Sequence, residues 1–493
     1  MRQKVAKVIV VGAGMGGLAS AIRLARAGLD VTLLEARDAP GGRMRTIPSV
    51  AGPVDAGPTV LTLRSVFDDL FETCGEKVDH HLNLVPQPLL ARHWWSDGST
   101  LDLTTDLESN VEAVASFAGA REAAAFRRFH DLSARLYDAF DLPMMRAARP
   151  DRRAIALAAG KDPRIWPALL PGMTLQRLLA LHFRDRRLRQ LFGRYATYVG
   201  GTPDRSPGVL ALIWAAEAQG VWAVEGGMHR LAAALAALAE RQGVTLRLNS
   251  PVTRILRQGG RATGVQLADG HSLAADHIVF NGDPAALLAG YLGDGPKEVV
   301  PEASVHPRSL SAWVWSYAAR ATGQPLVHHN VFFADDPARE FGPIAAGEMP
   351  EDATLYICAE DRSAGQVPDG PERFEIIMNG PPGRPWQPED YAQCRSRTFD
   401  RLRQFGLTFD PVPGEEGLTQ PSGFAKLFPG SQGSIYGLSP HGALASMKRP
   451  TARTALPGLW LAGGGAHPGA GVPMAALSGR HAAEAILKDL ASR

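Results

Sequence analysis

Four residues near the amino terminus have the types and the spacing needed to hold a dinucleotide. Gly12, Gly14 and Gly17 form a GxGxxG pattern, and Glu35 follows eighteen residues after the last of them. In such a pattern the first glycine permits a tight turn, the second lets the backbone approach a pyrophosphate, and the third lets a helix pack closely against a strand. The acid is placed to accept hydrogen bonds from a ribose hydroxyl, and its charge disfavours a 2′-phosphate. These residues predict a dinucleotide site that does not favour NADP.

The elements expected around these glycines support this prediction. The β-branched run Val8–Val11 predicts a strand buried on both faces of a parallel sheet, and Val31–Leu34 predicts a second apolar strand. Between them a helix is expected over Leu18–Ala27, ended by Gly28, with its first amides aimed at the phosphates. A glycine-rich turn without a ligand is the alternative, but it leaves Glu35 unexplained.

Length and composition exclude several other classes of protein. A chain of 493 residues is too long for one ordinary core, so two or three domains are expected. The net charge of +2 argues against nucleic acid as the main partner. No apolar run is long enough for a transmembrane helix, and the amino terminus does not read as a signal peptide. The three cysteines lack metal-ligand spacing, so no metal is expected; all are predicted to be small buried residues in a reducing cytosol, namely Cys74, Cys358 and Cys394.

A second strand–loop–helix unit lies at the other end of the chain. Leu459–Gly463 predicts a buried strand, residues 464–473 form a glycine-rich loop, and a helix is expected over Met474–Ile486. A helix amino terminus carries unpaired amides and partial positive charge. Placed at the edge of a flavin, it would stabilise the negative charge that accumulates there on reduction. This unit favours FAD over NAD, and a packing unit whose glycines merely permit close contact is the alternative.

The middle of the chain changes pattern twice. Residues 106–200 show apolar positions at helical spacing, and Asp97-Gly98 predicts the turn of a hairpin before them. Residues 284–446 contain recurring short strands, which predict a mixed or antiparallel sheet. Those strands are expected at Leu310–Tyr317, Val331–Ala334, Thr354–Ala359 and Phe374–Asn379.

With both glycine-rich units and the Gly41-Gly42-Arg43 turn in view, the chain resembles the glutathione-reductase-like flavoprotein amine oxidase/desaturase superfamily. The resemblance implies that the first motif holds the ADP half of FAD, that Arg43 lies by its phosphates, that the backbone of Val252 bonds the adenine, and that the last motif cradles the isoalloxazine. The implied cofactor-binding residues are Gly12, Gly14, Gly16, Gly17, Glu35, Gly42, Arg43, Val252, Gly464, Gly471, Val472 and Met474.

The fold class that follows is α/β, with three parts. A discontinuous Rossmann-like FAD-binding domain is expected at 1–75, 205–285 and 445–493. A mixed-sheet substrate domain is expected at 76–105 and 286–444, and a helical, membrane-facing subdomain at 106–204.

Further motifs make the chain similar to the bacterial carotenoid (phytoene) desaturases along nearly its whole length. They are Val54–Thr59, Trp95–Gly98, Tyr356–Arg362 and Ala466–Gly469. The ending Gly464–Arg480, together with Phe374–Pro382, is similar to the hydroxyneurosporene/methoxyneurosporene desaturases of purple photosynthetic bacteria. The resemblance implies an FAD-dependent oxidoreductase that introduces a C3–C4 double bond into acyclic 1-hydroxy- or 1-methoxy-carotenoids.

The chemistry of desaturation can be worked out separately. A hydride and a proton leave adjacent carbons, and because those C–H bonds are not acidic, hydride loss to flavin N5 comes first, beside a polyene that spreads the charge. The proton that follows needs only a weak base or water. The sequence offers no obvious triad or paired acids, so the reaction is expected to centre on the flavin. His467 is a weak candidate base, and a structural loop histidine is the alternative. A quinone or oxygen is expected to accept the electrons.

A carotenoid must come from a bilayer, and one segment suits that contact. A basic cluster precedes the apolar stretch Ile165–Met173, which favours peripheral attachment of a cytoplasmic protein to the inner, photosynthetic membrane. A solvated helix face beside a buried loop is the alternative. The basic residues are Arg146, Arg149, Arg152, Arg153, Lys161 and Arg164.

Other functions remain open from the sequence. A phytoene desaturase acting on phytoene or neurosporene is the nearest, followed by a flavin-dependent carotenoid isomerase. An amine oxidase of the same fold would need aromatic rings facing the flavin, for which Trp222 and Trp313 are candidates. A non-enzymatic lipid-binding module resembling the Rab GDP-dissociation inhibitors is disfavoured by the intact glycine motif and Glu35.

Overall fold

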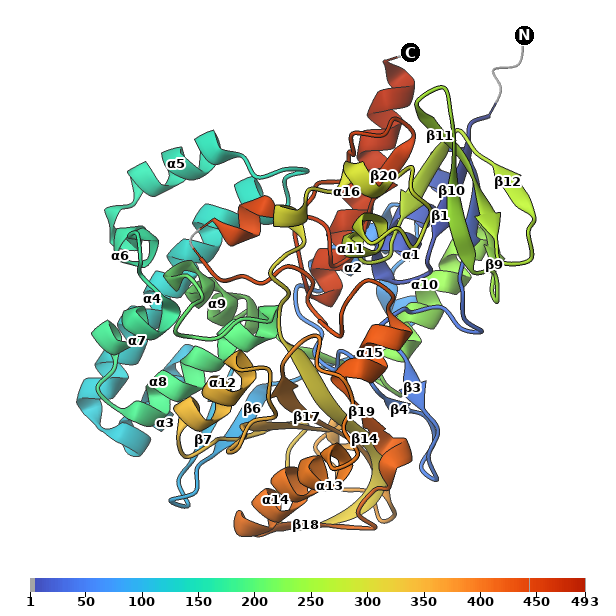
Figure 1. Ribbon diagram of the computed structural model, residues 1–493. Coiled ribbons are helices and arrows are strands. Elements are labelled where there is room, and N and C mark those ends of the chain that lie inside the picture. Colours follow the sequence, from blue (N-terminus) through green and yellow to red (C-terminus); the bar gives the residue numbers. More distant parts are fainter. Residues whose placement is uncertain (1–4, 443, 493) are drawn as a thin grey trace.

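A five-stranded parallel sheet brings the two glycine-rich units together. In the computed structural model, which describes residues 5–442 and 444–492, its strand order is β20-β13-β1-β2-β9. Neighbouring strands pair in register, with Val8 between His277 and Val31. The sheet is therefore assembled from three distant parts of the chain (Figure 1). Its strands are β1 (Lys7–Val11), β2 (Asp30–Leu34), β9 (Thr245–Arg247), β13 (His277–Phe280) and β20 (Leu459–Leu461).

Three helices pack on this sheet and share one hydrophobic core with it: α1 (Met15–Arg26), α10 (His229–Arg241) and α16 (Val472–Ala491). A Cβ on Gly479 would lie 2.3 Å from the carbonyl oxygen of Gly16, so α16 and α1 touch backbone to backbone. Both helices begin earlier than the apolar pattern predicts, because their first turns are built from the glycine-rich loops. The sequence analysis also missed an antiparallel meander beside the sheet, formed by β10 (Val252–Gln258), β11 (Arg261–Leu267) and β12 (Ser272–Ala274).

The second sheet has eight strands in the order β18-β14-β17-β16-β15-β6-β7, with β19 paired to β14. It is mixed, because β15 and β6 run parallel while the other pairs are antiparallel. The predicted hairpin is present as β6 and β7. The strands are β6 (Leu89–Trp94), β7 (Thr100–Thr104), β14 (Ser311–Gly323), β15 (His329–Phe332), β16 (Leu355–Ala359), β17 (Glu372–Gly380), β18 (Leu407–Asp410) and β19 (Leu418–Thr419).

The two faces of the second sheet differ in character. One face carries an aromatic core that includes Trp313 and Trp315 and packs against α13 (Asp390–Arg395) and α14 (Arg401–Gln404). The other face carries a row of residues paired directly across four strands, and this row lines a large cavity. Its members are Val314, Ile377, Tyr356 and Val331.

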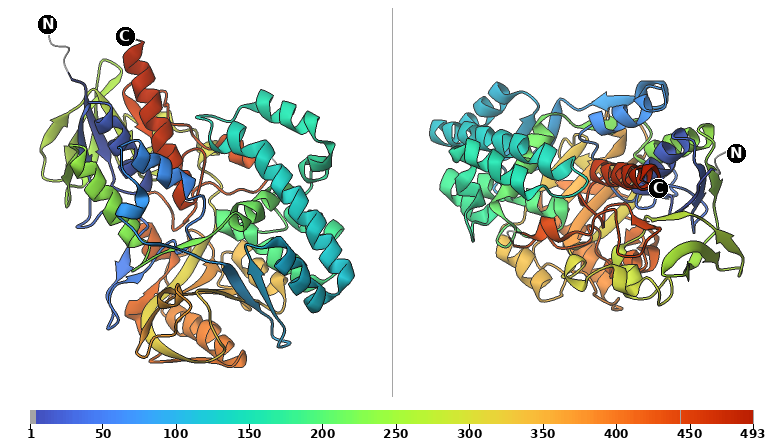
Figure 2. Two further views of the ribbon diagram at one scale, coloured as in Figure 1. Left: turned by 180° about the vertical axis from the view of Figure 1, so that it is seen from behind. Right: turned by 90° about the horizontal axis from the view of Figure 1, so that it is seen from above.

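The predicted helical region is present and lies on the far side of α16 from the five-stranded sheet (Figure 2). It has its own core, in which Phe126, Phe192 and Trp214 are fully buried. Within the described residues, no helix has the length and hydropathy needed to cross a bilayer. Its helices are α3 (Leu107–Ala118), α4 (Ala120–Phe140), α5 (Arg152–Lys161), α6 (Trp166–Leu169), α7 (Leu175–His182), α8 (Arg186–Gly193) and α9 (Leu212–Ala218).

Short elements connect these layers. The β4 segment leads from the first sheet to the cavity-facing side of the second, and α12 covers part of the cavity wall. The remaining elements are β3 (Thr46–Ile47), β4 (Val54–Asp55), β5 (Leu84–Pro86), β8 (Trp222–Val224), α2 (Ser65–Glu72), α11 (Pro284–Leu288), α12 (Pro337–Ala345) and α15 (Pro421–Leu427).

Candidate cofactor and substrate site

A cavity of about 2060 Å³ runs from the glycine-rich loops to the helical region. Pockets for single drug-sized ligands measure roughly 300–1,000 Å³. The space therefore suits a dinucleotide together with a second, long ligand. Loops after β1 and β20 line one end, the row on the second sheet lines the middle, and α7, α8 and α9 line the other end.

All but one of the predicted cofactor residues line this cavity. The exception is Gly17, where a Cβ would lie 2.0 Å from the carbonyl oxygen of Gly12, so its lack of a side chain lets α1 approach β1. The lining residues are Gly12, Gly14, Gly16, Glu35, Gly42, Arg43, Val252, Gly464, Gly471, Val472 and Met474.

The two glycine-rich units meet at the first turn of α1. A Cβ on Gly16 would lie 2.5 Å from the backbone nitrogen of Gly463, and one on Gly14 would lie 2.8 Å from Asn281 Nδ2. Asn281 donates from Nδ2 to the carbonyl of Gly12 over 3.0 Å. Sequence analysis missed Asn281, although it follows β13 directly and so lies at the carboxyl edge of the parallel strands, where α/β folds bind ligands.

Glu35 directly follows β2 and is nearly buried, with 5% of its surface exposed. Its carboxylate accepts hydrogen bonds from the backbone nitrogens of Ala13 (2.7 Å) and Arg37 (3.1 Å). Its carbonyl accepts from the nitrogen of Ser250, two residues before Val252. A carboxylate has about four acceptor sites, so Glu35 keeps capacity for a ribose hydroxyl at the place where the two segments join.

A buried cluster of charge lies near the last glycine-rich loop and consists of Arg43, Arg308, Arg449 and Asp283. Arg308 pairs with Asp283. Burial lowers the pKa of Arg43, whose Nε has no hydrogen-bond partner among the described residues. Burial also lowers the pKa of Arg449 to about 10, while its guanidinium donates to the carbonyl of Gly464 over 2.9 Å.

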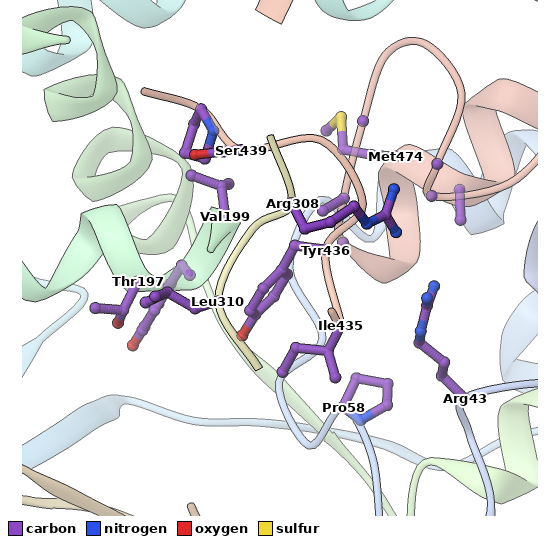
Figure 3. A pocket seen from close by; sticks show the side chains of 18 of the residues that line it. Arg43, Pro58, Thr197, Val199, Arg308, Leu310, Ile435, Tyr436, Ser439 and Met474 are labelled. Atoms are coloured by element: carbon purple, nitrogen blue, oxygen red, sulfur yellow. The ribbon is translucent and has the colours of Figure 1, made fainter. Parts of the chain in front are cut away.

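This four-residue cluster carries three positive charges and one negative, in surroundings that solvate charge poorly. Such an imbalance is relieved by an anion. Figure 3 shows Arg43, Arg308 and Tyr436 around the same part of the cavity. The residues therefore fit a ligand with a pyrophosphate, although Arg308 and Arg449 carry no local signal that the sequence analysis used.

The start of α16 also faces the cavity. Gly471 precedes the helix with a φ of +111°, a conformation that favours glycine. Val472 and Met474 then line the cavity from the first turn, and Figure 3 shows Met474 there. The unpaired amides of this turn carry partial positive charge, as the sequence analysis expected for the flavin end of the site.

His467 does not line the cavity. Its side chain is 1% exposed, its Nε2 donates to the carbonyl of Ala147 over 2.8 Å, and its ring stacks on His481. Burial lowers the pKa of His467. This placement corresponds to the structural alternative, because the ring ties the last glycine-rich loop to the segment that precedes α5.

The two tryptophans considered for an aromatic cage lie elsewhere. Trp313 is 1% exposed and belongs to the core on the opposite face of β14. Trp222 begins β8 and is absent from the cavity wall. Neither ring can sandwich an amine at this site.

Polar side chains on the cavity wall went unnoticed in the sequence. Thr59 Oγ1 lies 2.8 Å from the hydroxyl of Tyr356, which lies 2.7 Å from Nδ1 of His329. Farther along the wall, Glu340 accepts from Thr354 and from Nδ2 of Asn379, and burial raises the pKa of Glu340 to about 7. Because side chains alternate between the two faces of a strand, the sequence could have suggested that Tyr356 on β16 and Asn379 on β17 face the cavity.

The cysteine predictions need one correction. Cys358 and Cys394 are buried, but Cys74 is half-buried at the end of α2. Cys358 also has imidazole neighbours, since its Sγ lies 3.9 Å from Nε2 of His328. Burial raises the pKa of the Cys358 thiol well above its usual value, which keeps it protonated.

Comparison with known proteins places this arrangement among flavoproteins. The family model for flavin containing amine oxidoreductases matches residues 15–487. The chain is 86% identical to the hydroxyneurosporene desaturase of Cereibacter sphaeroides over 493 residues, which cover 100% of both chains. It is 56% identical to that of Rhodobacter capsulatus, over 98% of each chain. Cyclohexylamine oxidase of Brevibacterium oxydans superposes with a TM-score of 0.59 at 19% identity, over 99% of this chain and 100% of the other, which shows the shared fold.

Proposed function

The chain belongs to the flavin-containing amine oxidoreductase family and is a carotenoid desaturase, and we propose that it introduces the C3–C4 double bond of acyclic 1-hydroxy- and 1-methoxy-carotenoids. The observation that carries the substrate class is the 86% identity, without a gap in coverage, to a hydroxyneurosporene desaturase. The cavity supports it, because its length from the glycine loops to the helical region suits a long ligand beside a dinucleotide.

The flavin in this proposal is FAD. In it Gly12, Gly14 and Glu35, which line the cavity, would supply the turn, the close backbone approach and the ribose acceptor that a dinucleotide needs. Arg43 and Arg449 would hold the anionic part, and the first turn of α16 would face the ring system. Bound FAD supplies the hydride acceptor.

The protein's own residues then position the polyene and keep water away. The cavity-facing row of the second sheet is mostly apolar, with Val314 beside Ile377 and with Val331 on the other side of Tyr356. A hydride leaves most easily from a carbon next to the conjugated system, where the positive charge spreads over many carbons. The adjacent proton is then acidic and needs only a weak acceptor. We do not assign that step to His467, because its Nε2 is bound to Ala147.

The proposal includes a peripheral contact with the membrane through the surface of α5 and α6. Four side chains on these helices or in the segments next to them expose half or more of their area, namely Leu142 (70%), Leu157 (58%), Trp166 (53%) and Leu170 (53%). Of the basic cluster, Arg146 pairs with Asp141 and Arg164 with Asp162, which reduces its net charge. The cavity lining reaches Met144 and Met145 next to this surface, so a substrate path to the bilayer would be short. A quinone in the same bilayer, or oxygen, would accept the electrons.

The test supplies phytoene, neurosporene and 1-hydroxyneurosporene separately to the purified enzyme in lipid vesicles. Each new conjugated double bond shifts the carotenoid absorption to longer wavelength. We expect conversion of 1-hydroxyneurosporene and little change in phytoene. Efficient conversion of phytoene with none of the hydroxylated carotenoid would replace this function with that of a phytoene desaturase.

A further inference from the structure

The proposed reaction restricts where the substrate oxygen can lie. The oxygen is on C1 and the bond that becomes double is C3–C4, so three C–C bonds and one C–O bond separate it from the far reacting carbon. With ordinary bond lengths that separation is at most about 5 Å. A side chain that binds the oxygen must therefore lie on the wall next to the flavin, and not deep in the helical region.

Thr59 meets this requirement. It is two residues beyond Gly57, where a Cβ would lie 1.9 Å from the carbonyl oxygen of Arg43. The nitrogen of Ala56 also donates to the carbonyl of Arg45 over 2.9 Å, so the segment 56–59 runs alongside the turn that faces the cofactor. Thr59 lines the cavity with 7% of its surface exposed.

Two further groups stand behind Thr59 in a hydrogen-bonded chain. Thr59 Oγ1 contacts the hydroxyl of Tyr356 (2.8 Å), which contacts Nδ1 of His329 (2.7 Å). The Nε2 atom of His329 is buried and has no hydrogen-bond partner among the described residues. Tyr356 belongs to the cavity-facing row of the second sheet, so the chain runs from the core of that sheet to the cavity surface.

The proton positions in this chain can be worked out from His329. Burial lowers the pKa of His329 far below neutrality, so its ring carries one proton. A buried N–H without a partner costs more than an unused lone pair, which places the proton on Nδ1. Nδ1 then donates to Tyr356, Tyr356 donates to Thr59, and the Thr59 proton is left pointing to the cavity. That proton suits a hydroxyl oxygen and a methoxy oxygen equally, since both accept.

We propose that Thr59, oriented by Tyr356 and His329, donates a hydrogen bond to the C1 oxygen of the carotenoid and so makes the enzyme prefer oxygenated substrates, an assignment that rests on the proposed function. Glu340 is a rival polar group on the wall. Its oxygens accept from Thr354 and Asn379, and when ionised Glu340 has no proton to donate to a hydroxyl or methoxy oxygen. Thr354 comes two residues before Tyr356, whereas Asp55 of β4 contacts Glu360 just after the other end of β16. Thr354 therefore lies about 6–7 Å farther from β4 than Tyr356 does.

The experiment compares the flavin-loaded parent with Thr59→Val, which keeps the shape of the side chain without the hydroxyl, and with Thr59→Ser, which keeps the hydroxyl. Dissociation constants and KM are measured in detergent micelles for 1-hydroxyneurosporene, 1-methoxyneurosporene and neurosporene. In Thr59→Val we expect both oxygenated carotenoids to bind roughly 10-fold more weakly and neurosporene to change less than about 2-fold. For the oxygenated carotenoids Thr59→Val should raise KM and leave kcat nearly unchanged, because the hydrogen bond from Thr59 is present both in the bound substrate and in the transition state. Thr59→Ser should have dissociation constants and KM values close to those of the parent.

Tyr356→Phe removes the hydroxyl that orients Thr59. It should also reduce the preference for oxygenated carotenoids over neurosporene, but by a smaller factor than Thr59→Val does. Tyr317→Phe is its matched control, because that buried hydroxyl belongs to the same sheet but faces the other core and has no partner among the described residues. If Thr59→Val does not fold, the comparison of Tyr356→Phe with Tyr317→Phe tests the assignment of Thr59.

The outcomes separate the two levels of the argument. If the parent prefers 1-hydroxyneurosporene and both variants keep that preference, the assignment of Thr59 is wrong and the proposed function stands. If Glu340→Gln abolishes the preference instead, the oxygen binds there and the assignment of Thr59 is likewise wrong. If the parent converts phytoene and shows no preference for oxygenated carotenoids, the proposed function itself fails.

Discussion

The two ends of the cavity are built in different ways. The cofactor end consists of backbone: glycines at Gly14 and Gly16 that leave room for close approach, and amides at the start of two helices. The substrate end, like the middle of the cavity, consists of side chains; Tyr356 and Ile377, for example, are paired across β16 and β17 in the middle. A backbone cradle tolerates almost no added atom, whereas a wall of side chains can change one group and keep its shape.

The largest expected effect therefore lies at the cofactor end. Gly14→Val adds a branched side chain where a pyrophosphate must approach, and its Cβ alone would lie 2.8 Å from Asn281 Nδ2. We expect a colourless protein that has lost at least about nine-tenths of its flavin, since the added atoms take the place of the ligand. The flavin-to-protein ratio by absorbance checks this. Gly370→Val is the control, because no atom lies within 4 Å of a Cβ there. Full flavin content in Gly14→Val would mean that the dinucleotide binds elsewhere.

Substitutions at the proposed membrane contact should weaken vesicle binding without affecting the cofactor end of the cavity. Replacing Leu157, Trp166 and Leu170 by Ser removes exposed apolar area from α5, α6 and the turn after them. Binding to phosphatidylglycerol vesicles should weaken at least about 10-fold, and high salt should weaken it further by screening the basic residues. Flavin content should not change. Val367→Ser removes an equally exposed side chain in another part of the surface and should have no effect. Unaltered vesicle binding in the triple variant would show that another surface docks.

Sequence reasoning named residues at the glycine-rich end of the cavity and missed those on the wall formed by the second sheet, for a physical reason. A phosphate-binding loop needs its glycines at fixed spacing within one short segment, so Gly12, Gly14 and Glu35 could be recognised together. Thr59 and Tyr356 meet across 297 residues of chain, and only the register of several strands brings them together. The meander of β10, β11 and β12 was missed because its outer strands, β10 and β12, carry mostly exposed residues.

A buried acid on the substrate wall should make stability depend on pH. Burial raises the pKa of Glu340 to about 7 from an ordinary value of 4.5. The folded state therefore favours the protonated acid; this contribution is fully present below about pH 4.5 and is lost as the pH rises through 7. Glu340→Gln removes the titration, so it should match the parent at pH 5 and be more stable at pH 8, by up to about 3 kcal/mol. Denaturant unfolding at both pH values measures the difference. If Glu340→Gln has a lower free energy of unfolding than the parent at pH 8, the expected direction of the change in stability is wrong.

The smallest effect is expected at His467, which lies outside the cavity and ties the last glycine-rich loop to the segment before α5. Its position beside the flavin loop suggested a base, but the direction of the ring is set by the carbonyl of Ala147, which is 320 residues away in the chain. In His467→Gln the side-chain amide can still donate to that carbonyl, so the loop should keep its place. We expect kcat to fall less than about 3-fold, with the pH profile of kcat unchanged. Loss of a general base lowers kcat roughly 100-fold or more. A fall of that size in His467→Gln, with the acidic limb of the pH profile gone, would make His467 the general base. The reaction would then depend on a side chain as well as on the flavin and the shape of the cavity.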